Sequence, residues 1–211
     1  VGEAISLAAN QLILRQVEVW EGGAGRRTHG DSLGVHASDM INAWRNVVRV
    51  CSHRHTVTGL IIAAQNVSNS HSRSKGHRQT PFPQAVQLER VKATMPKALL
   101  RELDGSIREN NQLRACALVH RYGELGHAQR PLLDLLIQFG ASEDGRLHAE
   151  KYYRTASEEF TTMRKAFRWR QMVSLARVTA SCYGFTVDDK RGKGSGHRAP
   201  GYEEACRLLK V

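Results

Sequence analysis

The sequence predicts an all-α protein made of stacked helical hairpins, arranged either as a solenoid-like array or as an irregular helical bundle. Apolar residues recur at about 3.6-residue spacing in one segment after another along the 211 residues. Glycine or proline interrupts this spacing at intervals that suit short helices, and no pair of alternating segments joined by a hairpin turn is visible. Successive helix–turn–helix units are typical of bundles and solenoids.

The first expected unit is an N-terminal helical segment, residues 1–67. Its first helix has no capping residue ahead of Val1, so we expect the segment to continue an upstream part that this chain lacks. Four glycines in residues 21–32 end that helix. A second helix is expected to begin at Ser38 or Asp39, either of which can cap its first turn.

The second half of the chain, residues 84–211, is expected to form further helical hairpins. A flexible basic loop, residues 68–83, precedes them, and a second basic loop, residues 185–200, interrupts them near their end. Within this half, residues 84–95 are expected to form one helix. The following helix is expected to stop near Gly105.

The net charge of +11 suits an acidic partner such as nucleic acid, anionic lipid or an anionic ligand. The four cysteines are widely separated and imply no disulfide framework, so we expect reduced thiols and a cytoplasmic location. No apolar run approaches the roughly 18 residues of a membrane-spanning helix. We therefore expect no membrane association through a spanning segment.

Histidines are concentrated between Thr28 and His55, where four of them occur with two aspartates and one cysteine. The spacing of His29, Asp31 and His36 makes them candidate ligands for iron or another metal that prefers nitrogen and oxygen. The alternative for His36 is a packed histidine beside a helix start. His53 and His55 follow about five helical turns later, roughly 25 Å away along a straight helix, so one metal ion cannot use both groups.

A second polar group lies in residues 145–160. His148 and Tyr152 are four residues apart and share one face of a helix, and Glu159 lies on the same side. This face is either a proton-transfer or ligand edge or the polar seam between two packed helices. We take His36, His148 and Tyr152 as the candidate catalytic residues, because imidazole serves readily as a general acid or base near neutral pH.

Two stretches, GDSLGVHASDMINAWRNVVR and ALVHRYGELGHAQRPLLDLLIQFGASEDGRLHAEKYYRTASEEF, resemble a little-characterised bacterial helical family that is distantly similar to the questin oxidase-like proteins. His36 with the Asn42–Arg45 step carries the first likeness, and Arg121–His127 carries the second. The resemblance implies an all-helical oxidoreductase that acts on an aromatic or polyketide-like compound. The chain departs from the family in lacking an N-terminal histidine-bearing portion and in three Gly/Arg/Ser-rich loops.

The leading prediction is therefore the C-terminal part of a histidine-rich oxidoreductase, with iron or haem as the candidate cofactor and a small molecule as substrate. An upstream part or a partner chain would complete it. The alternative is a basic α-helical scaffold, without catalysis, that binds a protein or binds nucleic acid through the basic loops at 68–80 and 189–198. Aromatic side chains that could stack on bases are nearly absent from these loops, so we expect no specific nucleic-acid site.

Overall fold

The computed structural model describes residues 1–16, 32–73, 80–141, 146–183 and 200–210. Throughout these ranges the regular structure is helical and no strand occurs, which confirms the all-α prediction. The ten helices in them are α1 (Gly2–Arg15), α2 (Leu33–Val50), α3 (His55–Arg73), α4 (Ala85–Leu88), α5 (Pro96–Arg108), α6 (Gln112–Glu124), α7 (Gln129–Gly140), α8 (Arg146–Thr162), α9 (Trp169–Cys182) and α10 (Pro200–Leu209).

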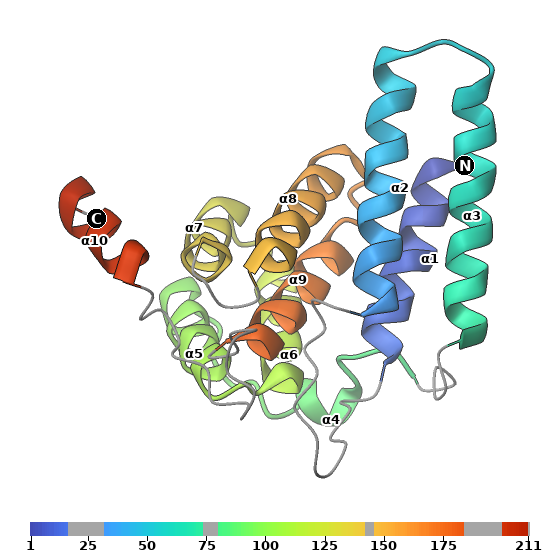
Figure 1. Cartoon of the computed structure of the whole chain (residues 1–211). Helices are drawn as coiled ribbons and strands as arrows, with labels where there is room; N and C mark the ends of the chain where they lie inside the picture. Colours follow the sequence, from blue (N-terminus) through green and yellow to red (C-terminus); the bar gives the residue numbers. More distant parts are fainter. Residues whose placement is uncertain (17–31, 74–79, 142–145, 184–199, 211) are drawn as a thin grey trace.

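The helices form an irregular bundle (Figure 1). Helices α1, α2 and α3 stand side by side, and the α2–α3 hairpin projects past the other helices. Helix α9 lies at the centre of the rest and packs most extensively against α6 and α8. Since α2 also contacts α8 and α1 also contacts α9, the three-helix unit is joined to the rest along its inner side.

Two apolar cores follow from this arrangement. The larger one lies mainly among α5 to α9, and the smaller one lies between α1, α2 and α3. Every residue of α9 from Gln171 to Cys182 is buried. A helix that is enclosed on all sides must find partners for its polar side chains inside the protein. Gln171 and Ser174 of α9 do so in the network described below.

Helix α2 begins earlier than the sequence predicted. Its cap is Ser32, whose Oγ accepts a hydrogen bond from the backbone N–H of Val35 at 3.2 Å. The expected start at Ser38 or Asp39 is wrong, because both side chains are engaged elsewhere: Ser38 donates to the carbonyl of Gly34, and Asp39 accepts from Thr155. His36 therefore lies within the first turn of α2.

Helix α3 extends to Arg73, so residues 68–73 of the expected basic loop are helical. Val67 and Ser70 are buried and continue the inward face of this helix past the predicted end. Residues 74–79 of that loop, and 185–199 of the second basic loop, lie outside the described residues.

Two other expected boundaries are wrong. Residues 84–95 form only the single turn of α4, since Val91 alone of the following residues is buried and the proline after Met95 disfavours helix there. Helix α5 continues through Gly105 to Arg108 because Leu103 and Ile107 keep its apolar face in the core.

Candidate functional site

The structure brings His36 and His148 together. His36 is exposed on the first turn of α2, and His148 is half-buried on the first turns of α8. Their ring centroids are 5.3 Å apart, and the rings meet edge to face at 88°. Two candidate catalytic residues from distant parts of the sequence thus form one imidazole pair at the α2–α8 contact, which is the pairing that a joint role requires.

Asp39 lies one turn beyond His36 on the same helix. Its Oδ1 accepts a hydrogen bond from the Thr155 hydroxyl at 2.7 Å, and the Lys151 ammonium lies 3.9 Å from Oδ2. No described residue donates a hydrogen bond to Oδ2, although this atom is buried. Burial raises the pKa of Asp39, while the Thr155 hydrogen bond, Lys151 and both imidazoles oppose that rise.

Tyr152 lies one turn beyond His148, but it is fully buried. Its hydroxyl hydrogen-bonds with the Ser174 hydroxyl at 2.8 Å. Burial raises the pKa of Tyr152 far above the ordinary value, and the nearby Asp39 carboxylate adds to the rise. The residue is therefore a neutral phenol beneath the imidazole pair, and its catalytic role stays a prediction.

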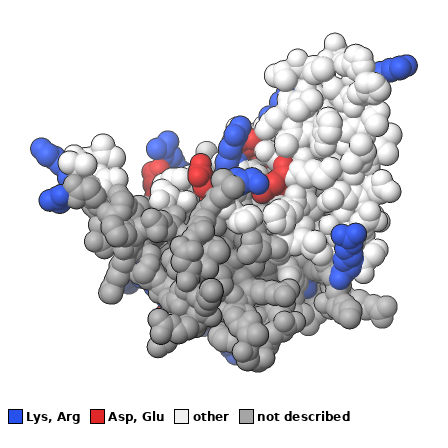
Figure 2. Space-filling view, viewed as in Figure 1, with Lys and Arg blue, Asp and Glu red and all other residues white. Residues whose placement is uncertain are grey.

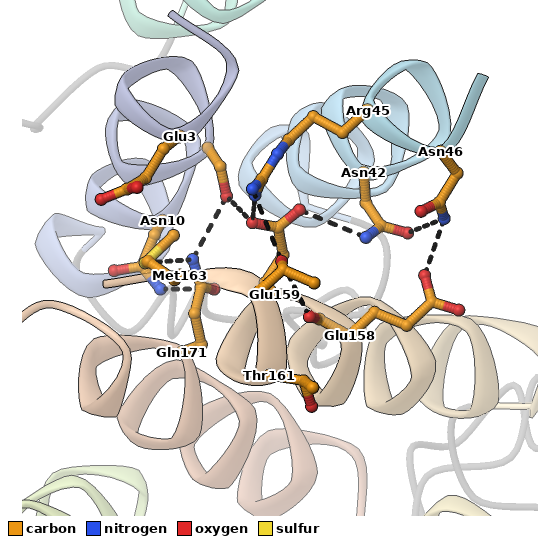
Figure 3. Close-up of polar contacts among 12 residues, drawn as sticks. Glu3, Asn10, Asn42, Arg45, Asn46, Glu158, Glu159, Thr161, Met163 and Gln171 are labelled. Atoms are coloured by element: carbon orange, nitrogen blue, oxygen red, sulfur yellow. Dashed lines mark hydrogen bonds and ion pairs between the residues drawn. The ribbon is translucent and has the colours of Figure 1, made fainter. Parts of the chain in front are cut away.

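Glu159 is the centre of a buried polar network (Figure 3). Its carboxylate accepts hydrogen bonds from the Ser6 hydroxyl at 2.8 Å and from the Asn42 amide at 3.2 Å, and it forms an ion pair with Arg45. These partners come from α1 and α2, whereas Glu159 lies on α8. A buried carboxylate is tolerated only when it is paired in this way.

The network continues into α9 through Asn10. The Asn10 amide donates to Ser174 Oγ at 2.7 Å and to Gln171 Oε1 at 3.2 Å, and the Gln171 amide donates to Ser6 Oγ at 3.3 Å. Hydrogen bonds therefore run without a break from Tyr152 to Glu159. This network is a polar seam between packed helices, which was one of the two interpretations of the His148–Glu159 face.

Sequence reasoning missed the partners of Glu159. The available signal was Asn10, a polar residue inside the apolar stripe of the first helix, together with Ser6 one turn before it. Buried polar positions of this kind predict a partner on a neighbouring helix, but they do not say which one.

The metal prediction rests partly on residues that the structure does not describe, since His29 and Asp31 fall in residues 17–31. In the described part of the chain, no three His, Cys, Asp or Glu side chains gather in a group that could hold a metal ion. His53 and His55 contact each other, with ring centroids 4.7 Å apart, just beyond the other end of α2. They do not join His36.

No family model, curated protein or solved structure matches this chain. Among the described helices, none is both long enough and apolar enough to cross a membrane. The candidate site therefore rests on its own geometry and on the motifs of the sequence.

Proposed function

We propose that the chain carries the proton-transfer centre of an oxidoreductase that acts on an aromatic or polyketide-like compound. The observation that carries the proposal is the edge-to-face contact of His36 with His148, with 5.3 Å between their ring centroids. Asp39, one turn further along α2, has one carboxylate oxygen that accepts no hydrogen bond from a described residue. The resemblance to questin oxidase-like proteins supplies the substrate class.

The geometry suits proton transfer for two reasons. His36 is exposed and His148 is half-buried, so a substrate can approach the pair from solvent. The Asp39 carboxylate lies close enough to both imidazoles for them to oppose the rise that burial causes in its pKa. A positioned imidazole of this kind accelerates proton removal by about 10²–10⁴-fold.

The chemistry we propose is the oxidation of a phenol. A hydroquinone loses two protons and two electrons to become a quinone. The imidazole pair accepts the hydroxyl protons, and dioxygen takes up the electrons with two protons and leaves as hydrogen peroxide. We assign no step to iron or haem, because the described residues supply no complete ligand set.

The test is dioxygen uptake with a panel of hydroquinones, catechols and hydroxylated anthraquinones. His36→Gln and His148→Gln should each lower the uptake that the wild-type chain shows by about 100-fold or more. His53→Gln is the matched control, because His53 is an exposed histidine at the far end of α2. Metal content and a visible absorption spectrum of the same preparation test the iron or haem prediction.

The proposal fails if the panel gives no uptake, or if His53→Gln lowers uptake as much as His36→Gln. Circular dichroism of each variant separates loss of activity from loss of fold. The exposed position of His36 makes its replacement the cleaner of the two variants.

One observation favours the second candidate function, a scaffold that binds a protein partner. The α2–α3 hairpin exposes aliphatic side chains, with Val50 at 87 %, Val57 at 60 % and Ile61 at 64 %. Figure 2 shows this hairpin as largely uncharged, with basic side chains at its ends. From Met40 to Arg73 the sequence has no acidic residue, which suits a partner that is apolar and acidic.

This candidate predicts retention on a column that carries an acidic amphipathic peptide. Replacing Val57 and Ile61 with serine should release the protein, since both side chains are exposed. Passage of the wild-type chain through the column would remove the candidate. We do not propose that the scaffold binds nucleic acid, because the basic loops expected to do so lie largely outside the described residues.

A further inference from the structure

A second cleft, separate from the imidazole pair, lies near the C-terminal end of α1. It encloses about 460 Å³ between that helix, the segment that precedes α4 and the start of α9. Phe82, Phe167 and Trp169 line it. This volume lies in the usual range for small-molecule sites, about 300–1,000 Å³, and none of the residues of the imidazole pair contributes to it.

The indole of Trp169 is held in place by its neighbours. A Cβ on Gly123 would lie 2.4 Å from an atom of the indole, so only glycine at this position lets the ring pack against α6. The indole also packs edge to face against Phe160, with the two ring centroids 5.2 Å apart. This wall of the cleft is therefore formed before a ligand arrives.

Phe82 is fixed in a similar way. Its backbone N–H donates to the carbonyl of Leu14 at 2.9 Å, and the buried Arg177 guanidinium lies 4.9 Å from the centroid of its ring. Aromatic walls that are already ordered lower the entropic cost of binding a flat ligand.

The charge of the cleft has one sign. Its charged lining residues are Arg15 and Arg170, and the described lining residues include no aspartate or glutamate. The Arg170 guanidinium lies 5.9 Å from the centroid of Phe167, and no ion pair joins it to a described carboxylate. A guanidinium beside an aromatic face suits a carboxylate or a phosphate attached to a ring, because its planar fork binds such groups through two hydrogen bonds.

We propose that this cleft binds a planar aromatic ring that carries an anionic group. The ring packs against Phe82, Phe167 and Trp169, and the anionic group pairs with Arg170. An aromatic carboxylate and a nucleoside monophosphate share this chemistry, and the experiment distinguishes them.

The test is calorimetric titration of the full chain with 2-naphthoate and with adenosine monophosphate. Their uncharged counterparts, 2-naphthol and adenosine, are the ligand controls. Arg170→Gln should weaken binding of the charged probe roughly tenfold or more, because a charge-assisted hydrogen bond is lost, and should leave the uncharged ones unchanged. Arg101→Gln is the matched variant, an exposed arginine on α5 that does not line the cleft.

Trp169→Phe should weaken binding of charged and uncharged probes alike, because it reduces the aromatic wall. The charged probe that binds more tightly identifies the ligand class. His36→Gln should bind either probe as the wild type does, so this proposal and the proposed oxidoreductase function can fail independently.

Three results would overturn the proposal. One is the absence of binding by either charged probe at millimolar concentration. Another is equal affinity for the charged and uncharged members of each pair. The third is an effect of Arg101→Gln as large as that of Arg170→Gln, which would show attraction by net charge alone. Because the Arg170 side chain is exposed, its replacement should leave the fold intact, and circular dichroism checks this.

Discussion

At the scale of single residues, the ionised Asp39 carboxylate should lower the free energy of unfolding. Its pKa is raised by burial, so the folded chain holds the ionised form less favourably than the unfolded chain does. This destabilisation is present near neutral pH and disappears as the pH falls below the unfolded value of about 3.9. Asp39→Asn keeps an oxygen for Thr155 and removes the charge.

We therefore expect Asp39→Asn to be at least as stable as the wild type at pH 7, with an advantage that shrinks as the pH is lowered toward 4. Chemical denaturation at both pH values measures it. A variant that is less stable than the wild type by the same amount at both pH values would contradict the assignment of the raised pKa. An acid kept at a cost to stability is typical of a functional site.

Glu159, in contrast, should stabilise the folded chain. Its carboxylate is 1 % exposed and pairs with Arg45, which is 13 % exposed, so Glu159→Gln leaves a guanidinium without its charge partner. We expect a loss of about 3 kcal/mol in the free energy of unfolding. Glu158→Gln, next in the chain and more exposed, should cost much less.

A partial recovery of stability in the Arg45→Met, Glu159→Gln double variant would show that the loss comes from the unpaired arginine. Equal losses for Glu158→Gln and Glu159→Gln would instead show that the buried network contributes no more than a surface pair does.

The sequence revealed only part of the site at this scale. The sequence singled out His36 and His148 as candidates because each lies near a helix start beside polar residues, and the structure places their rings in contact. The roles of Arg45 and Arg177 could not be predicted. A fully buried arginine such as Arg177, which donates to the carbonyl of Ile13, has the same local sequence as a solvated one. Its partners are more than 150 positions away in the chain.

At the scale of helices, Gly59 sets how closely α2 and α3 pack. A Cβ at this position would lie 2.2 Å from a ring carbon of Trp44, which α2 presents to α3. Gly59→Ala should therefore destabilise the chain by about 2 kcal/mol through overpacking. Gly105→Ala is the control, since no heavy atom lies within 4 Å of the added Cβ, and it should stabilise α5 by up to about 1 kcal/mol.

Thermal or chemical denaturation of both variants checks this prediction. Trp44→Leu in the Gly59→Ala background should recover stability, because the smaller side chain makes room for the methyl group. A Gly59→Ala variant that is as stable as Gly105→Ala would show that the two helices do not pack as described.

Helices were easier to predict than their ends. The apolar spacing that identifies α3 or α5 reports which face is buried, and this information survives one glycine, so α5 runs through Gly105. The ends depend on caps and on neighbours. Ser32 caps α2 although Ser38 and Asp39 are equally suitable residue types, because the latter two are taken up by contacts that only the folded chain provides.

At the scale of the whole molecule, the sequence predicted stacked hairpins but did not decide between a solenoid and a bundle. The difference lies in contacts that join distant helices, such as α2 with α8 and α1 with α9. The polar network around Glu159 bridges both contacts (Figure 3). Glu159 of α8 pairs with Asn42 and Arg45 of α2, and Asn10 of α1 donates to Gln171 of α9. The network fixes the relative position of α2 and α8, and that position brings the two imidazoles together.

We propose that His36 and His148 act as one proton-transfer unit. The most direct test compares dioxygen uptake by the wild type, the two single His→Gln variants and the double variant, on the best substrate of the panel. If the pair is one unit, each single variant loses about 100-fold or more and the double variant loses no more than either. Single variants that stay within about twofold of the wild type, or a double variant whose loss is the product of the single losses, would contradict the claim.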